Sequence, residues 1–378
     1  MSRRLWLVVP LAAGAAGIVA IAAAPARAAA SASQVWPPFV LVSGLLLIGA
    51  AADADGLFEA AGGWLARLPG PPVLLFLAAL AVVAAVTAVL NLDTAVVFVT
   101  PVLLAAAASR GVDEAAFLYG SVAMCNSASL VLPGSNLTNL LVIGHARVSG
   151  ATYALHMAPA SVAAVIVPAL VLVLLFRRLL RGTALPSGAA SPRLILGPGL
   201  VAGVGAGLLV LFTRTPALPV LALGIAAALT SHLLRRLDRR RLELALDVRP
   251  LVLLFLVALV LGTLARGWSG PAHLLAVAAP WETTAIAAVS SLIVNNLPAA
   301  VLFSAHAPAH APALLVGLDV GPNLAVSGAL SAILWLRIAR SAGRRPSLRT
   351  YSLVGIAVAP LAMAAALVAL RLFASGGL

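Results

Sequence analysis

Charged side chains are scarce in this sequence. Asp, Glu, Lys and Arg make up only 9% of its 378 residues, whereas 62% of the residues are hydrophobic and the mean hydropathy is +1.11. In soluble domains about a quarter of the residues are charged. This composition excludes a soluble domain and indicates a protein for which the lipid bilayer is the solvent.

Thiols and recognisable catalytic motifs are also missing. The single cysteine, Cys125, excludes an internal disulfide and a metal site built from several thiolates. The sequence has no phosphate-binding Gly-Lys-Ser loop, no nucleophile elbow and no His-Glu-x-x-His zinc motif. We therefore expect no enzyme, no bound cofactor and no metal site, and any use of ATP would need a partner protein.

Long apolar stretches, by contrast, are abundant. Runs of about twenty apolar residues recur along the chain, and a helix of that length crosses the hydrocarbon core of a bilayer. The unbroken run at residues 74–90 excludes the alternating pattern of barrel strands. Because lipid cannot bond to exposed backbone groups, the spans must be helices. The sequence predicts an all-α, multi-pass membrane protein with about ten or eleven crossings.

The basic residues are almost all arginines in short loops, although the net charge is +13. Their placement follows the positive-inside rule of membrane proteins and does not suggest nucleic-acid binding. We therefore predict the cytoplasmic membrane of the cell as the location. The arginine-rich segments that mark its cytoplasmic side are residues 3–4, 177–181, 235–249 and 337–349.

Residues 1–35 form a separate N-terminal segment in this prediction. Two arginines precede an apolar run at residues 5–24, and small residues follow at 26–33. A cleaved signal peptide has this order, but the apolar run is longer than is usual for one. The length favours a retained first helix.

The rest of the chain reads as two related halves. Residues 41–50 (LVSGLLLIGA) resemble residues 256–265 (LVALVLGTLA), and residues 89–95 (VLNLDTA) correspond to residues 293–299 (IVNNLPA). Repeats with polar interruptions at matching places are typical of secondary transporters, whose binding site lies between the repeats.

The predicted boundaries follow from this correspondence. Repeat 1 covers residues 36–180, and a Gly- and Pro-containing loop covers residues 181–194. Repeat 2 covers residues 195–378 and includes two preceding scaffold helices at about 194–212 and 217–234, which return the chain to the same side.

The first interruption in each half carries Asn91 and Asp93, or Asn295 and Asn296. Such side chains are costly in lipid, so we expect them to face protein or water and to have a function. The alternative is structural, because Asn and Asp also bond helices together and cap helix starts.

The second interruption is richer in hydrogen-bonding groups. Pro133 and Gly134 allow the backbone to leave helical geometry there. The polar side chains around them are Ser127, Ser129, Ser135, Asn136, Thr138 and Asn139. The matching segment, residues 317–323, brings Asp319 into an equivalent break. Helix ends exposed at membrane depth can hold an anion, a neutral hydroxyl-bearing solute or a cation.

Four stretches together resemble the arsenical-pump membrane proteins of the ion-transporter superfamily. They are residues 90–111, 126–144, 290–301 and 316–340, with Asn-Asn-Leu-Pro and Gly-x-Asp-x-Gly-Pro-Asn as the most specific motifs. The resemblance implies two inverted repeats, each with a re-entrant hairpin and a discontinuous helix. It also implies export of trivalent arsenic or antimony, driven by protons or assisted by a soluble ATPase, with a homodimer as a further expectation.

The chain departs from that family in three respects, one of which is an N-terminal region that is one span short. Asn126 stands where the arsenical permeases tend to have an acidic residue, and Asn323 and Ala325 replace their usual Lys and Thr.

Arsenite at neutral pH is the uncharged trihydroxide, so its site needs hydrogen-bond donors and acceptors more than countercharge. We predict that the substrate-binding residues are Asn91, Thr94, Ser127, Ser129, Ser135, Asn136, Asn295, Asn296 and Asn323. Proton coupling requires a titratable group within the membrane, for which Asp319 is the first candidate and Asp93 the second. Antiport by alternating access is the predicted mechanism.

Two other transport functions stay open. Ser135-Asn136-Leu137-Thr138 is similar to a Ser-Asn-Thr signature of sodium-coupled carboxylate importers, although Leu137 interrupts it and no Arg or Lys lies in either break. A sodium/proton antiporter would also use Asp93 and Asp319.

Three further residues receive structural interpretations. Glu282 follows Pro280-Trp281 and is expected to start a helix. His306 and His310 flank Pro308, which argues against the helix that a metal-binding pair at this spacing requires. Cys125 is expected to be a packed side chain.

Overall fold

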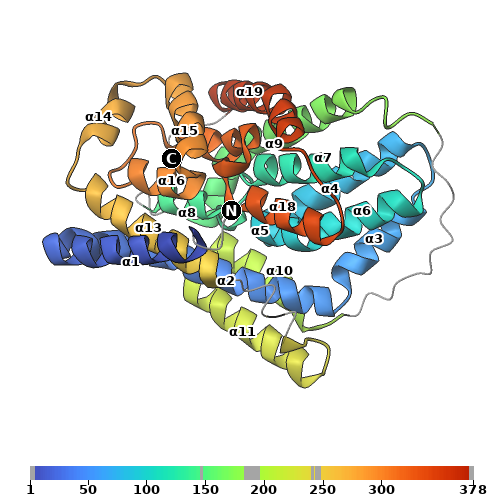
Figure 1. The fold of residues 1–378 in the computed structure, drawn as a ribbon, viewed down its shortest axis with the longest axis horizontal. Coiled ribbons are helices and arrows are strands. Elements are labelled where there is room, and N and C mark those ends of the chain that lie inside the picture. The colour runs from blue at the N-terminus through green and yellow to red at the C-terminus, as the bar shows by residue number, and fades with distance from the viewer. Residues whose placement is uncertain (1–4, 145–147, 183–195, 240–241, 243–247, 374–378) are drawn as a thin grey trace.

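The computed structural model describes residues 5–144, 148–182, 196–239, 242 and 248–373 (Figure 1). Every regular element among these residues is a helix, and they contain no β-strand. The all-α prediction is therefore confirmed. The first two arginines and nearly all of the predicted loop at residues 181–194 lie outside the described residues.

Two long helices begin the chain, α1 (Leu5–Ala23) and α2 (Pro25–Ala54). The predicted boundary between residues 35 and 36 falls inside α2, which continues through Pro37 and Pro38. A proline removes one backbone donor and usually weakens a helix. Here α2 packs along α11 and α13, and its residues Val35 and Phe39 are buried, so packing holds the helix across the two prolines.

The first half then folds as a hairpin, a broken helix and a long helix. Its elements are α3 (Leu57–Arg67), α4 (Pro72–Val89), α5 (Leu92–Thr94), η1 (Ala95–Val99), α6 (Thr100–Ser109), α7 (Glu114–Ala128), η2 (Pro133–Ser135), α8 (Leu137–Ile143) and α9 (Gly150–Leu175). Because α5 and η1 fold back against α4, these helices form a hairpin that turns at Asn91.

The second half repeats this order. After α10 (Pro198–Phe212) and α11 (Ala217–Leu233) come α13 (Val248–Ala265), α14 (Gly270–Val277), α15 (Pro280–Val294), α16 (Asn296–Phe303), α17 (Ala311–Val320), η3 (Gly321–Leu324), η4 (Val326–Gly328), α18 (Leu330–Ser341) and α19 (Leu348–Phe373). Helices α15 and α16 pack as a second hairpin that turns at Asn295, and α17 and α18 are the second broken helix.

The two hairpins lie at opposite ends of the molecule. Helices α3, α4 and α6 gather at one end, whereas α14, α15 and α16 gather at the other (Figure 1). Between them the halves interlock, because α9 packs along α19 and α17 contacts both α7 and α8. The broken helices are therefore held in the middle of the fold.

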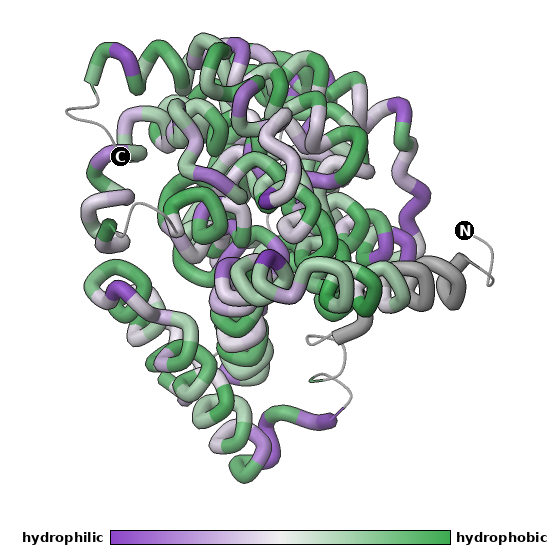
Figure 2. The backbone as a smooth tube through the Cα atoms, turned by 90° about the vertical axis from the view of Figure 1, so that its left-hand side faces the viewer, coloured by the Kyte–Doolittle hydropathy of each residue, from purple (hydrophilic) through white to green (hydrophobic). Residues whose placement is uncertain are grey.

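Five of the described helices are long and apolar enough to cross a membrane, or six if the bent pair α13–α14 is one span. Helices α10 and α11 are shorter apolar helices. Large hydrophobic side chains lie exposed on the outer helices, among them Leu155 (79% exposed) and Val204 (61%). Figure 2 shows hydrophobic residues over most of these helices. Such apolar outer surfaces are what a multi-pass membrane protein presents to lipid.

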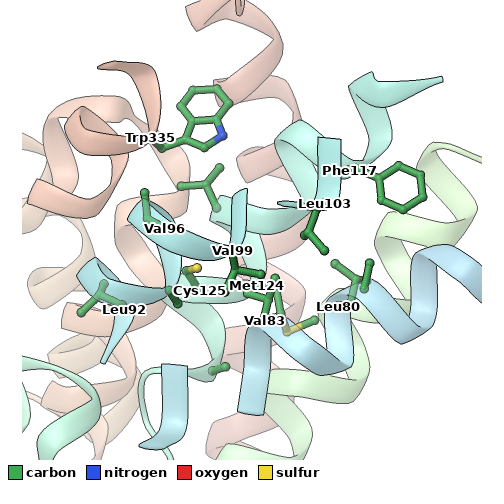
Figure 3. Close-up of a cluster of buried hydrophobic side chains, with 14 of the residues drawn as sticks. Leu80, Val83, Leu92, Val96, Val99, Leu103, Phe117, Met124, Cys125 and Trp335 are labelled. Carbon is green, nitrogen blue, oxygen red and sulfur yellow. The ribbon is translucent and has the colours of Figure 1, made fainter. Parts of the chain in front are cut away.

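An apolar cluster supports the first broken helix. Side chains of α4, the first hairpin and α7 meet there, among them Val83, Val96, Met124 and Cys125 (Figure 3). Cys125 is fully buried, which confirms its expected role as a packed side chain. Trp335 of α18 packs on the same cluster, so both halves contribute to it.

Two small features fix the ends and crossings of helices. Asp55 is fully buried, accepts a 2.7 Å hydrogen bond from the backbone N–H of Gly199 at the start of α10, and pairs with Arg236 after α11.

Gly355 of α19 lies so close to the backbone of Asn323 that a β-carbon would overlap the carbonyl oxygen. Close helix contacts in membranes commonly depend on such small residues.

Candidate functional site

The site forms where the two broken helices meet. In the first break, Pro133 and Gly134 begin a short 3-10 turn, and Asn136 is extended and caps α8 by accepting a bond from the backbone N–H of Thr138. In the second, Gly321 and Pro322 begin a 3-10 turn after α17. Both breaks lie where the sequence has Pro beside Gly, as predicted.

Asp319 joins the two halves. Its side chain is 1% exposed, and its Oδ1 accepts hydrogen bonds from the Asn136 amide (3.0 Å) and from the Thr138 hydroxyl. Its Oδ2 has no partner. Asp319 lies in the last turn of α17 and not in the break itself, so the sequence-based placement was slightly wrong. From that helix end it faces the break of the other half.

Ser129 and Asn139 complete this group. The Ser129 hydroxyl accepts a 3.2 Å bond from Asn136, and the Asn139 amide donates to the backbone oxygens of Ser129 and Leu132. The amide oxygen of Asn139 has no partner. We call Ser129, Asn136, Thr138, Asn139 and Asp319 the carboxylate cluster.

A second group surrounds Asn323, which is 2% exposed. Its Oδ1 accepts a 2.9 Å bond from the Asn126 amide, and its own amide donates to the Ser127 hydroxyl (3.1 Å). Ser331 of α18 donates to the Asn126 Oδ1 (2.9 Å). We call Asn126, Ser127, Asn323 and Ser331 the amide cluster. Two of the positions that depart from the arsenical permeases, 126 and 323, thus contact each other directly.

The turn of the first hairpin is buried and poorly satisfied. Asn91 has a φ of 144°, and its Oδ1 caps α5 by accepting a 2.8 Å bond from the backbone N–H of Thr94. The atoms without partners are Asn91 Nδ2, Asp93 Oδ1 and the hydroxyls of Thr87 and Thr94. Ser135 donates to the backbone oxygen of Ala88, which ties this hairpin to the first break.

The second hairpin contacts its own break in a similar way. Asn295 has a φ of 78°, caps α16 through a 3.4 Å bond from the backbone N–H of Leu297, and donates to the Ser327 carbonyl (3.1 Å). Asn295 is half-buried, whereas Asn296 is 5% exposed. Ser327 in turn donates to the Leu292 carbonyl (3.0 Å).

The predicted site residues therefore divide into separate groups. Ser129, Asn136 and Asp319 meet in one cluster, and Ser127 and Asn323 in another. Asn91, Asp93 and Thr94 lie at the first hairpin turn, and within the described part of the chain no hydrogen bond joins them to Asp319.

Some residues were missed by the sequence-based prediction. Thr138 and Asn139 were noticed beside the first break but given no role, and their bonding partners show what they do. Ser331 and Tyr351, whose hydroxyl donates to the Pro322 carbonyl, carried no signal in the sequence.

Buried polar atoms almost always have a hydrogen-bond partner in proteins, and leaving one without costs about 1–3 kcal/mol. The unpartnered oxygens of Asp319, Asn139 and Asp93 suit a proton or a hard cation, which prefers oxygen ligands. The unpartnered amide and hydroxyls at the hairpin turn suit a neutral polar solute.

The structure favours structural roles for the remaining candidates. Within the described ranges no group of three or more His, Cys, Asp or Glu could hold a metal ion. His306 and His310 lie in the irregular link between α16 and α17, as Pro308 predicted. Glu282 accepts a 2.8 Å bond from the backbone N–H of Ala279 at the start of α15, which confirms its expected capping role.

Comparison with known proteins now adds an independent line of evidence. Residues 3–330 match the CitMHS family, described as citrate transporter. A 46 kDa membrane protein of Mycobacterium leprae is 27% identical over 370 residues, covering 88% of this chain and 85% of that protein.

The fold has a counterpart among solved structures. The YdaH transporter of Alcanivorax borkumensis, a structure described as having an unusual topology, superposes with a TM-score of 0.58 over 97% of this chain and 96% of that one. Sequence identity is 14%, so this likeness concerns the fold alone.

Proposed function

We propose that this chain, which belongs to the CitMHS family of citrate transporters and is therefore a secondary membrane transporter, exports trivalent arsenite or antimonite in exchange for protons. We place it in the cytoplasmic membrane, with the arginine-rich ends of its helices on the cytoplasmic side.

The chemistry of the two breaks carries this proposal. Residues 129–136 and 321–329 contain no Arg or Lys, and their polar side chains are amides and hydroxyls. A bare carboxylate substrate entering this site would lose its hydration without meeting a fixed positive charge there. An uncharged trihydroxide needs only the donors and acceptors that these side chains supply. Trivalent arsenite is such a solute.

Asp319 is the coupling group in this proposal. Its Oδ1 is occupied by bonds from the other half, whereas its Oδ2 has no partner and is the atom to which a proton would bind. Protonation of Oδ2 neutralises the Asp319 carboxylate, which accepts the hydrogen bonds from Asn136 and Thr138. The same contact between the halves would therefore strengthen or weaken as the proton arrives or leaves, which is what coupling to alternating access requires.

A cation-coupled carboxylate transporter is the second candidate. The family description names citrate, and the unpartnered oxygens of Asp319, Asn139 and Asp93 suit a cation that would enter with an anion. In that case the cation supplies the positive charge that the breaks lack.

Transport into inside-out membrane vesicles separates these functions. Vesicles from a host without its own arsenite exporter are given a pH gradient and no ATP, and arsenite, citrate and sodium are followed in separate assays. We expect arsenite to accumulate only when the gradient and the protein are both present. Accumulation of citrate or sodium, without accumulation of arsenite, would show that arsenite is not the substrate. Accumulation that requires added ATP and a soluble protein fraction would show that an ATPase partner supplies the energy.

A further inference from the structure

A surface cleft lies at the end of the molecule to which the first hairpin belongs. Its volume is about 470 Å³, and it is lined by Glu114 and Tyr119 of α7 and by Arg344 and Pro346 of the link between α18 and α19. Clefts of roughly 300–1,000 Å³ commonly hold small molecules. None of these residues belongs to the carboxylate or amide cluster.

A second, much smaller cavity shares the lining residue Tyr119 with this cleft. It has a volume of about 10 Å³ and is lined by Tyr119, Ala123, Asn323, Tyr351 and Gly355. A space of roughly 10–15 Å³ holds a single water molecule. Tyr119 therefore lines both the surface cleft and the smaller cavity, to which Asn323 of the amide cluster also belongs.

Tyr119 belongs to a row of three packed aromatic side chains, of which Tyr351 also lines the smaller cavity. Trp335 lies between Tyr119 and Tyr351, with ring centroids 5.6 and 5.5 Å apart, and the indole N–H donates to the Leu118 carbonyl (2.8 Å). All three are buried, with 7%, 0% and 3% of Tyr119, Trp335 and Tyr351 exposed. We call Tyr119, Trp335 and Tyr351 the aromatic barrier.

The barrier is held by contacts between the two halves. The Tyr119 hydroxyl accepts a 2.8 Å bond from the backbone N–H of Ser347. Nearby, Arg344 donates two 2.6 Å bonds to the Glu114 carboxylate. Both contacts join the beginning of α7 to the α18–α19 link, so they separate together if these segments move apart. The Arg344 side chain is 47% exposed and that of Glu114 is 20% exposed, so salt can screen this ion pair.

We propose that the cleft is the entrance by which the transported polar solute reaches Asn323 from the predicted cytoplasmic side, and that the aromatic barrier closes it in this conformation. This assignment rests on the chain being a transporter, as proposed above, but it does not depend on which solute is carried. The cleft offers Arg344 and Glu114 to a polar solute, and the amide cluster receives it once Tyr119 has moved.

The accessibility of the inner cavity tests the barrier without any transport assay. Val122 also lines that cavity, so Val122→Cys in a Cys125→Ser background places one thiol behind Tyr119. In inside-out vesicles, a membrane-impermeant thiol reagent should label this cysteine about tenfold faster when Tyr119→Ala is added. Leu314→Cys, a buried position on α17, is the control and should label equally slowly with and without Tyr119→Ala. Equal labelling of Val122→Cys in both backgrounds would overturn the proposed barrier.

Crosslinking tests whether solute passes this way. In the Cys125→Ser background, Glu114→Cys with Arg344→Cys is joined by a short reducible bifunctional thiol reagent, and Arg337→Cys with Ser341→Cys, both on α18, is the control pair. We expect the first crosslink to reduce transport about tenfold, with recovery after reduction, and the control crosslink to change nothing. Full transport by the protein crosslinked between Glu114→Cys and Arg344→Cys would rule out this entrance. If the uncrosslinked protein carries none of arsenite, citrate and sodium, the proposed function is contradicted and not the entrance. The labelling experiment still decides whether the aromatic barrier exists.

Discussion

The side-chain amide of Asn126 donates a 2.9 Å hydrogen bond to the amide oxygen of Asn323, 197 residues further along the chain. The oxygen and the nitrogen of both side-chain amides are hydrogen-bonded, because Ser331 also donates to the Asn126 oxygen and the Asn323 nitrogen donates to Ser127. The bond thus fixes the orientation of two uncharged groups at the place where α7 meets the second break.

Removing this bond should destabilise the protein. Asn126→Leu leaves the Asn323 oxygen and the Ser331 hydroxyl buried without a partner, and each such group costs about 1–3 kcal/mol. We expect a lower midpoint in thermal unfolding of the detergent-solubilised protein. Ser109→Ala, which removes a local bond at the end of α6, is the control and should unfold close to the parent. An unchanged midpoint in Asn126→Leu would show that water replaces the lost partner.

Asn126 and Asn323 should tolerate replacement by charged residues only when both are replaced and the two charges are opposite. Asn126→Asp with Asn323→Lys introduces the acidic and basic residue types that the arsenical permeases tend to have at these positions. A single charge buried here has no counter-ion, whereas the double substitution supplies one at hydrogen-bonding distance. We expect each single variant to lose folded protein and the double variant to recover most of it, as measured by size-exclusion chromatography. Additive losses would mean that the two side chains do not pair when charged.

Asp319→Asn should uncouple transport from the pH gradient. Asparagine retains an oxygen that can accept from Asn136 and Thr138, but it cannot carry the proton. We expect normal thermal stability and a loss of at least about tenfold in gradient-driven accumulation. Glu59→Gln is the control, because Glu59 is an exposed acidic residue in the first turn of α3 and belongs neither to the two clusters nor to the lining of the cleft. Gradient-driven accumulation at the parent rate in Asp319→Asn would move proton transfer to another residue, with Asp93 the next to test.

Gly355→Ala should disturb the second break through the backbone. The added methyl group would overlap the Asn323 carbonyl, which cannot move without shifting the amide cluster. Overpacking of this kind costs about 1–3 kcal/mol. Gly207→Ala on α10 is the control, since its nearest neighbour, a methyl group of Val89, is 3.9 Å away. We expect Gly355→Ala, but not Gly207→Ala, to lower the unfolding midpoint and to reduce transport. Equal midpoints and equal transport rates for the two variants would contradict this.

Salt should weaken the ion pair between Arg344 and Glu114 at the cleft. Glu114 raises the pKa of the Arg344 guanidinium, so the arginine loses its charge only at a higher pH than usual and stays charged in any physiological buffer. High ionic strength screens exposed charges. Labelling of Val122→Cys should therefore speed up with salt, and Glu114→Gln with Arg344→Gln should remove that dependence. A labelling rate independent of salt in the charged parent would show that the pair does not hold the cleft closed.

Local sequence signals were enough to find the breaks and turns. Pro beside Gly at 133–134 and 321–322 interrupts the helices as predicted, and Asn91 and Asn295 take positive φ values at the two hairpin turns. These positions are predictable because the cause, a missing donor or a side chain that caps a helix, lies within a few residues.

The partners of the polar side chains were not predictable in the same way. The bonds from Asn136 and Thr138 to Asp319 span more than 180 residues, and no local pattern specifies them. The continuity of α2 across Pro37 and Pro38 has the same origin, because the packing of α2 against α11 and α13, which depends on distant residues, keeps the helix intact.

The placement of the two hairpins at opposite ends has a thermodynamic consequence. In a transporter whose halves share one order of elements, exchanging the roles of those halves would open the site toward either compartment through similar interactions. The concentrations of solute and coupling ion on the two sides decide the direction of flux, and a sufficiently reversed gradient would drive the same molecule backward.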